Sequence, residues 1–249
     1  MTDTKVALVT GGTSGIGRAT AIGLANAGYK VAICGRRQEK LDDVVKTKTA
    51  TQIFGVTCDV SDPKSVADLF AAVRNEFGRV DVVFNNAGQS APAASVGDTE
   101  TDAWLEVVST NLNGAFFVAR EAFRTMRDQT PQGGRIINNG SISAHTPRPH
   151  AVAYNATKHA ISGLTKSISL DGRPYGIACG QIDIGNTATD MTAQMNAGML
   201  QADGSTKPEP TFNVQHVADA VRYMSDLPLD ANVQTITVMA TNMPYVGRG

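Results

Sequence analysis

Short apolar segments rich in Val, Ile and Ala alternate with longer segments whose apolar residues recur every three or four positions. The first pattern predicts strands at 5–10, 29–34, 52–58, 80–85, 135–138, 177–182 and 235–239. The second pattern predicts helices at 16–27, 63–78, 104–126 and 154–170. This alternation indicates an α/β fold: a doubly wound parallel sheet of about seven strands, with right-handed crossovers and helices on both faces.

The chain of 249 residues suits a single domain, 1–249, that buries enough surface to need no disulfide or metal. Segment 187–213, which contains Gly and Pro residues, is predicted to be an insertion that forms a lid on the substrate side. Met191, Met195 and Met199 recur every four residues and would share one helix face there. They would form either an adaptable apolar lid or the ordinary packing of a small helix.

Charge and cysteine usage narrow the classes of function. The chain carries 22 Lys and Arg against 23 Asp and Glu, a net charge of −1, without a basic stripe. We therefore expect no nucleic-acid partner and no membrane partner. Cys34, Cys58 and Cys179 lack metal or redox spacing and are expected to be buried thiols. The absence of an apolar signal region and of a membrane-length apolar run favours a cytoplasmic setting.

A glycine-rich turn, TGGTSGIG at 10–17, joins the first predicted strand to the first predicted helix. Glycines here permit a tight turn, let backbone N–H groups approach a pyrophosphate, and let the helix pack closely on the sheet. The helix N-terminus that follows favours phosphate charge. A tight turn without a ligand is the alternative, but a strand, glycine turn and helix in this order favour nucleotide binding.

The three glycines at 11, 15 and 17 are followed, in order, by CDV at 58–60, NNAG at 85–88, STN at 109–111, Ser141 and Tyr154-x-x-x-Lys158. This series resembles the short-chain dehydrogenase/reductase family, in its compact single-domain branch, over nearly the whole chain. The resemblance implies a Rossmann-type sheet and a nicotinamide-dependent oxidoreductase for a small-molecule carbonyl or alcohol substrate. It also implies a homo-oligomer, a dimer or homotetramer.

The resemblance further implies a set of cofactor contacts, with Asp59 against the adenine and Thr189 against the nicotinamide carboxamide. The implied set is Gly11, Thr13, Ser14, Gly15, Ile16, Gly17, Asp59, Val60, Asn86, Ala87, Gly88, Tyr154, Lys158, Ile184, Gly185 and Thr189. Sites that bind NAD often place an acid at the end of the second strand, where this chain has Gly35.

Arg36 and Arg37 follow Gly35, and a guanidinium suits a 2′-phosphate by bidentate bonding. Arg36 and Arg37 therefore favour NADP(H) over NAD(H) as the cofactor. The alternative is a pair of solvated arginines that pair with Glu39 or Asp42.

Hydride transfer to a carbonyl leaves an oxygen that needs a proton, and Tyr154 is the candidate general acid/base. Lys158 stands four residues later on the same helix face, where its ammonium favours the phenolate. Ser141 follows the fifth strand, where a ligand crevice opens, and is expected to hold the substrate oxygen. Asn111 interrupts a helical pattern, and the resemblance implies a local distortion there that holds a water linked to Lys158. The alternative for Tyr154 and Lys158 is a solvated helix face.

Ile184-Gly185 stands where this family usually has Pro-Gly, so the path of this loop is less constrained. For Asp183 we favour a surface or turn role over a charge behind the active site. His145, Arg148 and His150 border the expected substrate side, where they would recognise an anion or, as we favour, remain solvated loop residues.

Ala156, Ala160, Gly163 and Ser167 form a stripe of small residues on the predicted catalytic helix. Gly in a helix interior costs about 1 kcal/mol relative to Ala, and close packing would offset that cost. We therefore predict a helix–helix contact there, either with a second subunit or with the preceding long helix.

Two other functions compete with the oxidoreductase. A non-catalytic nucleotide-sensing regulator on the same fold would not need Ser141, Tyr154 and Lys158 together. A sugar epimerase or dehydratase would need a longer chain with a separate substrate domain.

Overall fold

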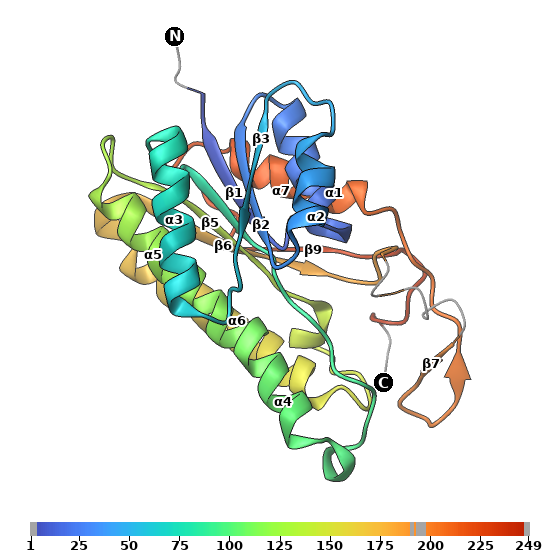
Figure 1. Ribbon diagram of the computed structural model, residues 1–249. Helices are drawn as coiled ribbons and strands as arrows, with labels where there is room; N and C mark the ends of the chain where they lie inside the picture. The colour runs from blue at the N-terminus through green and yellow to red at the C-terminus, as the bar shows by residue number, and fades with distance from the viewer. Residues whose placement is uncertain (1–3, 190–191, 193–197, 247–249) are drawn as a thin grey trace.

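The computed structural model describes residues 4–189, 192 and 198–246. Figure 1 shows a twisted sheet between two layers of helices. The sheet strands are β1 (Val6–Thr10), β2 (Lys30–Gly35), β3 (Ile53–Thr57), β4 (Val82–Asn85), β5 (Gly134–Asn139), β6 (Ile177–Ile184) and β9 (Thr235–Val238). All neighbouring strands are parallel, in the order β3-β2-β1-β4-β5-β6-β9, which confirms the predicted doubly wound fold.

Two apolar layers pack the helices onto the two faces of this sheet (Figure 1). One face is covered by α3 (Pro63–Phe77), α5 (Ala115–Asp128) and α6 (Val152–Asp171). The opposite face is covered by α1 (Gly15–Asn26), α2 (Gln38–Val45) and α7 (Gln215–Asp226). Because both faces are buried, the central strands consist of apolar residues without alternation, as VALVT in β1 illustrates.

Local signals explain where the helices begin and end. At the start of α3, the Asp62 carboxylate accepts a hydrogen bond from the Lys64 amide at 2.9 Å, and Pro63 occupies the first turn. Gly78 ends the same helix with a φ of +84°, a left-handed conformation that favours glycine.

The long helix predicted at 104–126 is divided in the structure. It consists of α4 (Thr101–Val108), a π-helical segment Ser109–Gly114, and α5. A π-helical turn inserts an extra residue into the helical ladder, and such turns often mark functional sites. The predicted boundaries therefore hold to within a few residues, but the predicted continuity does not.

Besides short 3-10 turns, two α-helices and two strands of the described residues were not predicted from the sequence. Helix α2 buries only Leu41 and Val44, so its apolar period is too short to stand out. Helix α7 carries Val217, Val221 and Met224 at helical spacing, a signal that the sequence does contain. The remaining two are the short antiparallel strands β7 (Met199–Leu200) and β8 (Thr206–Lys207), which lie away from the main sheet (Figure 1).

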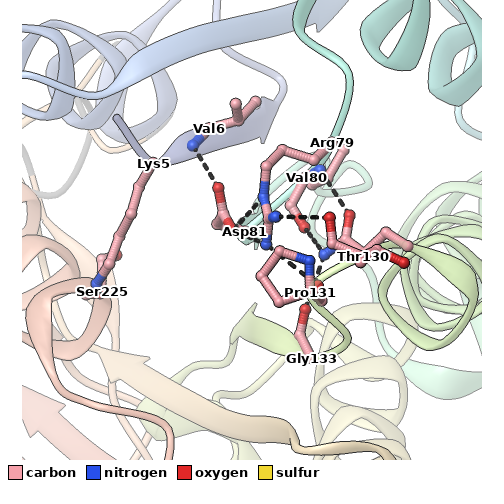
Figure 2. A network of polar contacts seen from close by, with 10 residues as sticks. Lys5, Val6, Arg79, Val80, Asp81, Thr130, Pro131, Gly133 and Ser225 are labelled. Atoms are coloured by element: carbon pink, nitrogen blue, oxygen red, sulfur yellow. Dashed lines mark hydrogen bonds and ion pairs between the residues drawn. The ribbon is translucent and has the colours of Figure 1, made fainter. Parts of the chain in front are cut away.

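A polar network fastens β1, β4 and the segment before β5 together at the amino-terminal edge of the sheet. Figure 2 shows Asp81 at its centre, where the carboxylate accepts hydrogen bonds from the Val6 amide and the Arg79 guanidinium, both at 2.8 Å. The Arg79 guanidinium also donates to the carbonyl oxygens of Thr130 and Pro131. This network lies at the edge opposite the carboxyl ends of the strands, where ligands of such folds bind.

None of the helices in the described ranges is long and apolar enough to span a membrane.

Candidate active site

A cleft of about 600 Å³ opens at the carboxyl ends of the central strands. Every residue expected to contact the cofactor lines this cleft, from the glycine turn to Thr189. Gln89, Thr110, Asn139, Gly140, Thr187 and Thr192 are further lining residues that the sequence did not single out. Segments far apart in the chain therefore meet at one site, as the topology of a doubly wound sheet requires.

The glycine turn forms a cradle of backbone at one end of the cleft. Gly11 and Gly15 have φ values of +63° and +48°, in the left-handed region that other residues rarely adopt. A Cβ on Gly17 would lie 2.2 Å from the Gly11 carbonyl oxygen and 2.6 Å from the Asn86 side-chain nitrogen. Since α1 begins at Gly15 without an acidic residue in its first turn, its free N–H groups face this cradle with no competing carboxylate.

Thr10 joins the turn to the neighbouring wall of the cleft. Its hydroxyl oxygen accepts hydrogen bonds from the amides of Asn86 (2.9 Å) and Ala87 (3.0 Å), and its carbonyl oxygen accepts one from the Asn86 side chain. The Asn139 side chain in turn donates to the Asn86 amide oxygen at 2.8 Å. The ends of β1, β4 and β5 are thereby held in register around the cleft.

The two arginines after β2 lie exposed at the rim of the cleft. Neither Arg36 nor Arg37 forms an ion pair within the described ranges, so the expected alternative of pairing with Glu39 or Asp42 is wrong. Hydrogen bonds from Ser61 lower the pKa of Asp59, which lies beside them in the cleft. The charge of Arg36 also lowers the pKa of Asp59, but neither guanidinium is held in an ion pair among the described residues, so both can turn to a ligand at the rim.

Tyr154 and Lys158 lie on the first turns of α6 and both line the cleft. Lys158 is 6 % exposed, and its ammonium donates a hydrogen bond to the Asn139 carbonyl oxygen at 2.7 Å. The same ammonium lies 5.5 Å from the centre of the Tyr154 ring. A buried ammonium beside a phenol is not a solvated helix face, so that alternative is wrong for Lys158.

Ser141 lies in the turn that follows β5, directly after Asn139 and Gly140, which line the cleft. It is 5 % exposed and does not line the cleft. Its hydroxyl oxygen accepts a hydrogen bond from the Ser143 amide at 3.1 Å and thereby begins the short 3-10 helix Ile142–Ala144. Its own amide donates to the Asp183 carboxylate at 3.0 Å.

Asn111 lies within the π-helical segment, which provides the local distortion expected at this position. Its side chain is buried and forms two hydrogen bonds of 2.8 Å with the backbone of Gln89, one as donor and one as acceptor. Asn113, the second asparagine of the same segment and the one expected to be a solvated or backbone-bonding residue, is exposed. Through these two bonds Asn111 holds the loop that follows β4 against the π-helical segment.

Asp183 is completely buried, so the surface or turn role that we favoured for it is wrong. Besides its bond from the Ser141 amide, its carboxylate lies 2.6 Å from the Gln181 side-chain nitrogen and 2.8 Å from Nε2 of His145.

Strand β6 continues to Ile184, two residues beyond the predicted end at 182, and Ile184 is buried in the apolar layer beneath α1 and α7. The path of this segment is therefore that of a regular strand.

Arg148 was expected to be a solvated loop residue, and this expectation is wrong. Its guanidinium pairs with the buried Glu209 at 2.6 Å and donates to the Asn186 side chain at 2.7 Å. Burial raises the pKa of Glu209, but hydrogen bonds from Arg148, Gln201 and Asn186 outweigh it and lower that pKa to about 2. The insertion at 187–213 is thereby fastened to the loop before α6.

We expected Met191, Met195 and Met199 to share one helix face in this insertion, and the structure describes only Met199 of the three. Met199 lies in β7, which pairs with β8 as a short antiparallel hairpin, so it does not belong to a helix. Met191 and Met195 lie outside the described residues.

The small-residue stripe lies on the outer side of α6. Ala156, Gly163 and Ser167 are exposed, and a Cβ added at Gly163 would meet nothing within 4 Å among the described residues. The alternative contact with the preceding long helix is therefore wrong for this face.

Cys34, Cys58 and Cys179 are buried free thiols, as predicted.

Comparison with known proteins agrees with this arrangement. The family model described as short chain dehydrogenase matches residues 5–200. A 3beta-hydroxysteroid dehydrogenase from Mediterraneibacter gnavus is 41% identical over 197 residues, which are 78% of this chain and 70% of that protein. An uncharacterized oxidoreductase from Staphylococcus aureus is 34% identical over 94% of this chain and 96% of its own.

Among solved structures, a variant of actinorhodin polyketide ketoreductase with NADPH has a TM-score of 0.86 and 30% identity, covering 96% of this chain and 97% of its own. An acetoin dehydrogenase from Salmonella typhimurium has a TM-score of 0.78 and 30% identity, covering 95% of each chain. These matches span the glycine turn, the cleft and α6 alike. The chain therefore belongs to the short-chain dehydrogenase family and is an oxidoreductase of CH–OH or carbonyl groups that uses a nicotinamide cofactor.

Proposed function

We propose that the protein interconverts a ketone and a secondary alcohol with NADP(H), with Tyr154 as the general acid/base. The observation that carries this proposal is the position of the buried Lys158 ammonium, 5.5 Å from the Tyr154 ring, inside the cleft that also holds the glycine cradle. Proton donor, ammonium and phosphate cradle thus share one site, as the reaction requires.

The residues of the cleft fit a nicotinamide dinucleotide. Because Gly17 has no Cβ, the turn folds tightly against the start of α1, and its backbone N–H groups would cradle a pyrophosphate beside the α1 N-terminus. Arg36 and Arg37 would hold a 2′-phosphate, and Thr189, which lies against Gly15 of the turn, would contact the nicotinamide carboxamide. When bound, the cofactor supplies or accepts the hydride.

The protein side chains supply position and the proton. Tyr154 donates its phenolic proton to the carbonyl oxygen in reduction and accepts a proton in oxidation. Lys158 stabilises the phenolate by charge, and its bond to the Asn139 carbonyl oxygen fixes the ammonium in place. The Ser141 hydroxyl accepts a bond from the Ser143 amide but keeps its own proton, which it would donate to the substrate oxygen from just beyond Gly140 at the cleft wall. Asn111 orders the water through which Lys158 exchanges protons with solvent.

The substrate is proposed to enter between the 143–151 loop and the insertion at 187–213, which acts as a lid. The similar proteins include a hydroxysteroid dehydrogenase and a polyketide ketoreductase, so a substrate panel begins with cyclic ketones and secondary alcohols of that size. A homo-oligomer, either a dimer or a tetramer, is proposed to form through the exposed stripe on α6. A cytoplasmic setting stays a prediction.

Nicotinamide absorbance with this panel tests the activity directly. Tyr154→Phe should lose turnover by about 100-fold or more while cofactor affinity stays within about twofold, because only the proton donor is removed. Turnover close to wild type in Tyr154→Phe would refute the proposed mechanism. Tight cofactor binding without turnover on any substrate of the panel would instead favour the nucleotide-sensing regulator.

Cofactor preference is tested separately. Wild type should bind NADPH more tightly than NADH, and Arg36→Asp should reverse this order, because a carboxylate repels the 2′-phosphate and bonds a 2′-hydroxyl. Lys166→Asp, a charge reversal on the exposed surface of α6, is the matched control and should leave the ratio of affinities unchanged. Equal affinity of the wild type for both cofactors would refute the NADP(H) preference.

A further inference from the structure

A completely buried carboxylate lies directly beneath Ser141, and the reaction as proposed above assigns it no role. Asp183 stands near the end of β6 and is 0 % exposed. One of its oxygens accepts hydrogen bonds from the Ser141 amide (3.0 Å) and the Gln181 side chain (2.6 Å), and the other lies 2.8 Å from Nε2 of His145. A buried carboxylate is tolerated only where such partners compensate its lost hydration.

This carboxylate contacts both ends of the turn that carries Ser141. The turn starts at Ser141, passes through the 3-10 helix Ile142–Ala144 and reaches His145. Asp183 binds the first residue through its amide and the last through its ring. The approach is possible because residue 140 is glycine: a Cβ there would lie 2.1 Å from the nearer Asp183 oxygen.

The same contacts connect the turn to the helix that carries Tyr154 and Lys158. The Gln181 side chain donates to Asp183 and to the Ser162 hydroxyl, and its amide oxygen accepts from the Thr165 hydroxyl. Ser162 and Thr165 both belong to α6. One strand thus sets the Ser141 turn and the catalytic helix relative to each other through side-chain hydrogen bonds.

We infer that Asp183, whose second carboxylate oxygen lies against the His145 ring, is a positioning residue. It holds the Ser141 hydroxyl at the distance from Tyr154 that the reaction needs. This inference rests on the proposed function, since it gives Asp183 an effect on turnover only through Ser141. A general acid and an oxygen-binding hydroxyl must act on one substrate oxygen together, and a displacement of about 1 Å costs about 100-fold in rate. Asp183 is expected to act on kcat and not on cofactor affinity, because it does not line the cleft.

The test compares Asp183→Asn, Ser141→Ala and the double variant, with any substrate of the panel that the wild type turns over. Asp183→Asn removes the charge and keeps the shape, and we expect it to lower kcat about tenfold with an unchanged Kd for NADPH, measured by fluorescence. In the Ser141→Ala background the same substitution should change kcat by no more than about twofold, since the hydroxyl to be positioned is gone.

Two further variants keep the test decisive. His145→Ala, on a half-exposed side chain that leaves the core intact, should lower kcat in the same direction if Asp183→Asn does not fold. Asp81→Asn is the matched control, because it removes the same charge from a polar network at the far edge of the sheet and should leave kcat unchanged.

The outcomes separate the inference from the proposed function. Full turnover in Ser141→Ala overturns both, because Ser141 then has no role to support. Loss of turnover in Ser141→Ala together with wild-type kcat in Asp183→Asn and His145→Ala overturns the positioning role alone. An additive loss in the double variant also overturns it, since Asp183 would then act independently of Ser141.

Discussion

The buried ion pair between Arg148 and Glu209 gives a stability prediction whose size and pH dependence both follow from the structure. Glu209 is 1 % exposed, and its carboxylate accepts hydrogen bonds from Arg148 (2.6 Å), Asn186 (2.7 Å) and Gln201 (3.0 Å). Glu209→Gln keeps the shape and an acceptor oxygen but removes the charge. Arg148, with 12 % of its side chain exposed, then loses its partner in a largely buried position.

The magnitude follows from the pKa of Glu209. That pKa lies at about 2 in the folded chain against an ordinary value of 4.5, a difference that corresponds to about 3 kcal/mol of stability at neutral pH. Because the folded-state pKa is the lower one, this stability is fully present above pH 4.5 and is lost as the pH falls toward 2. The gap between wild type and Glu209→Gln should therefore shrink from about 3 kcal/mol at pH 7 to about 2 kcal/mol at pH 3.5.

Urea unfolding of both proteins across this pH range measures the gap. Glu76→Gln makes the same chemical change on an exposed side chain of α3 that has no partner among the described residues, and it should show no gap at any pH. A gap that is below about 1 kcal/mol at pH 7, or that does not change with pH, would show that the ion pair does not stabilise the fold as reasoned.

Three other substitutions test the cradle, the sheet edge and the outer face of α6. Gly17→Ala should weaken NADPH binding about tenfold or more by calorimetry, because its Cβ would lie 2.2 Å from a carbonyl oxygen of the turn. Gly23→Ala in the same helix meets no atom closer than 3.8 Å and should instead raise stability by about 0.5–1 kcal/mol, so equal affinities in the two variants would refute the cradle. Asp81→Asn should lower the free energy of unfolding by about 1–3 kcal/mol at unchanged kcat, and a midpoint in urea equal to that of wild type would contradict the role of its network (Figure 2). Gly163→Leu should yield a smaller species in light scattering, and an unchanged mass would exclude the stripe as a subunit contact.

The parallel, doubly wound sheet and the meeting of distant motifs were predictable from the sequence because they depend on short-range patterns. Apolar runs predict buried parallel strands, and parallel strands bring their carboxyl ends to one edge. The glycine turn, Asn86 and Lys158 therefore meet in one cleft, although they lie far apart along the chain. The helical spacing of Tyr154 and Lys158 likewise places them side by side without knowledge of the fold.

Long-range polar partners were not predictable in this way. Arg148 and Glu209 are 61 residues apart, and Ser141 and Asp183 are 42 apart, so no local pattern relates either pair. An Asp at a strand end or an Arg in a Pro-containing loop is most often exposed, and that general tendency gave the wrong role to both residues. Only the folded chain shows that each charge has a partner from another segment.

The departure from the family pattern at Ile184 explains why Asp183 is held so firmly. Pro lacks an N–H and has a fixed φ, so it is poorly tolerated inside a parallel sheet. Ile has the free N–H and β-branched side chain that a central strand favours, and Ile184 pairs with Val238 in the ladder between β6 and β9. Strand geometry therefore continues through Asp183, whose partner in the ladder is Thr237, and fixes the direction of its side chain toward the turn of Ser141. Ile184→Pro would restore the family pattern, but it would also interrupt the strand and so remove the geometry that directs the Asp183 side chain toward the turn of Ser141.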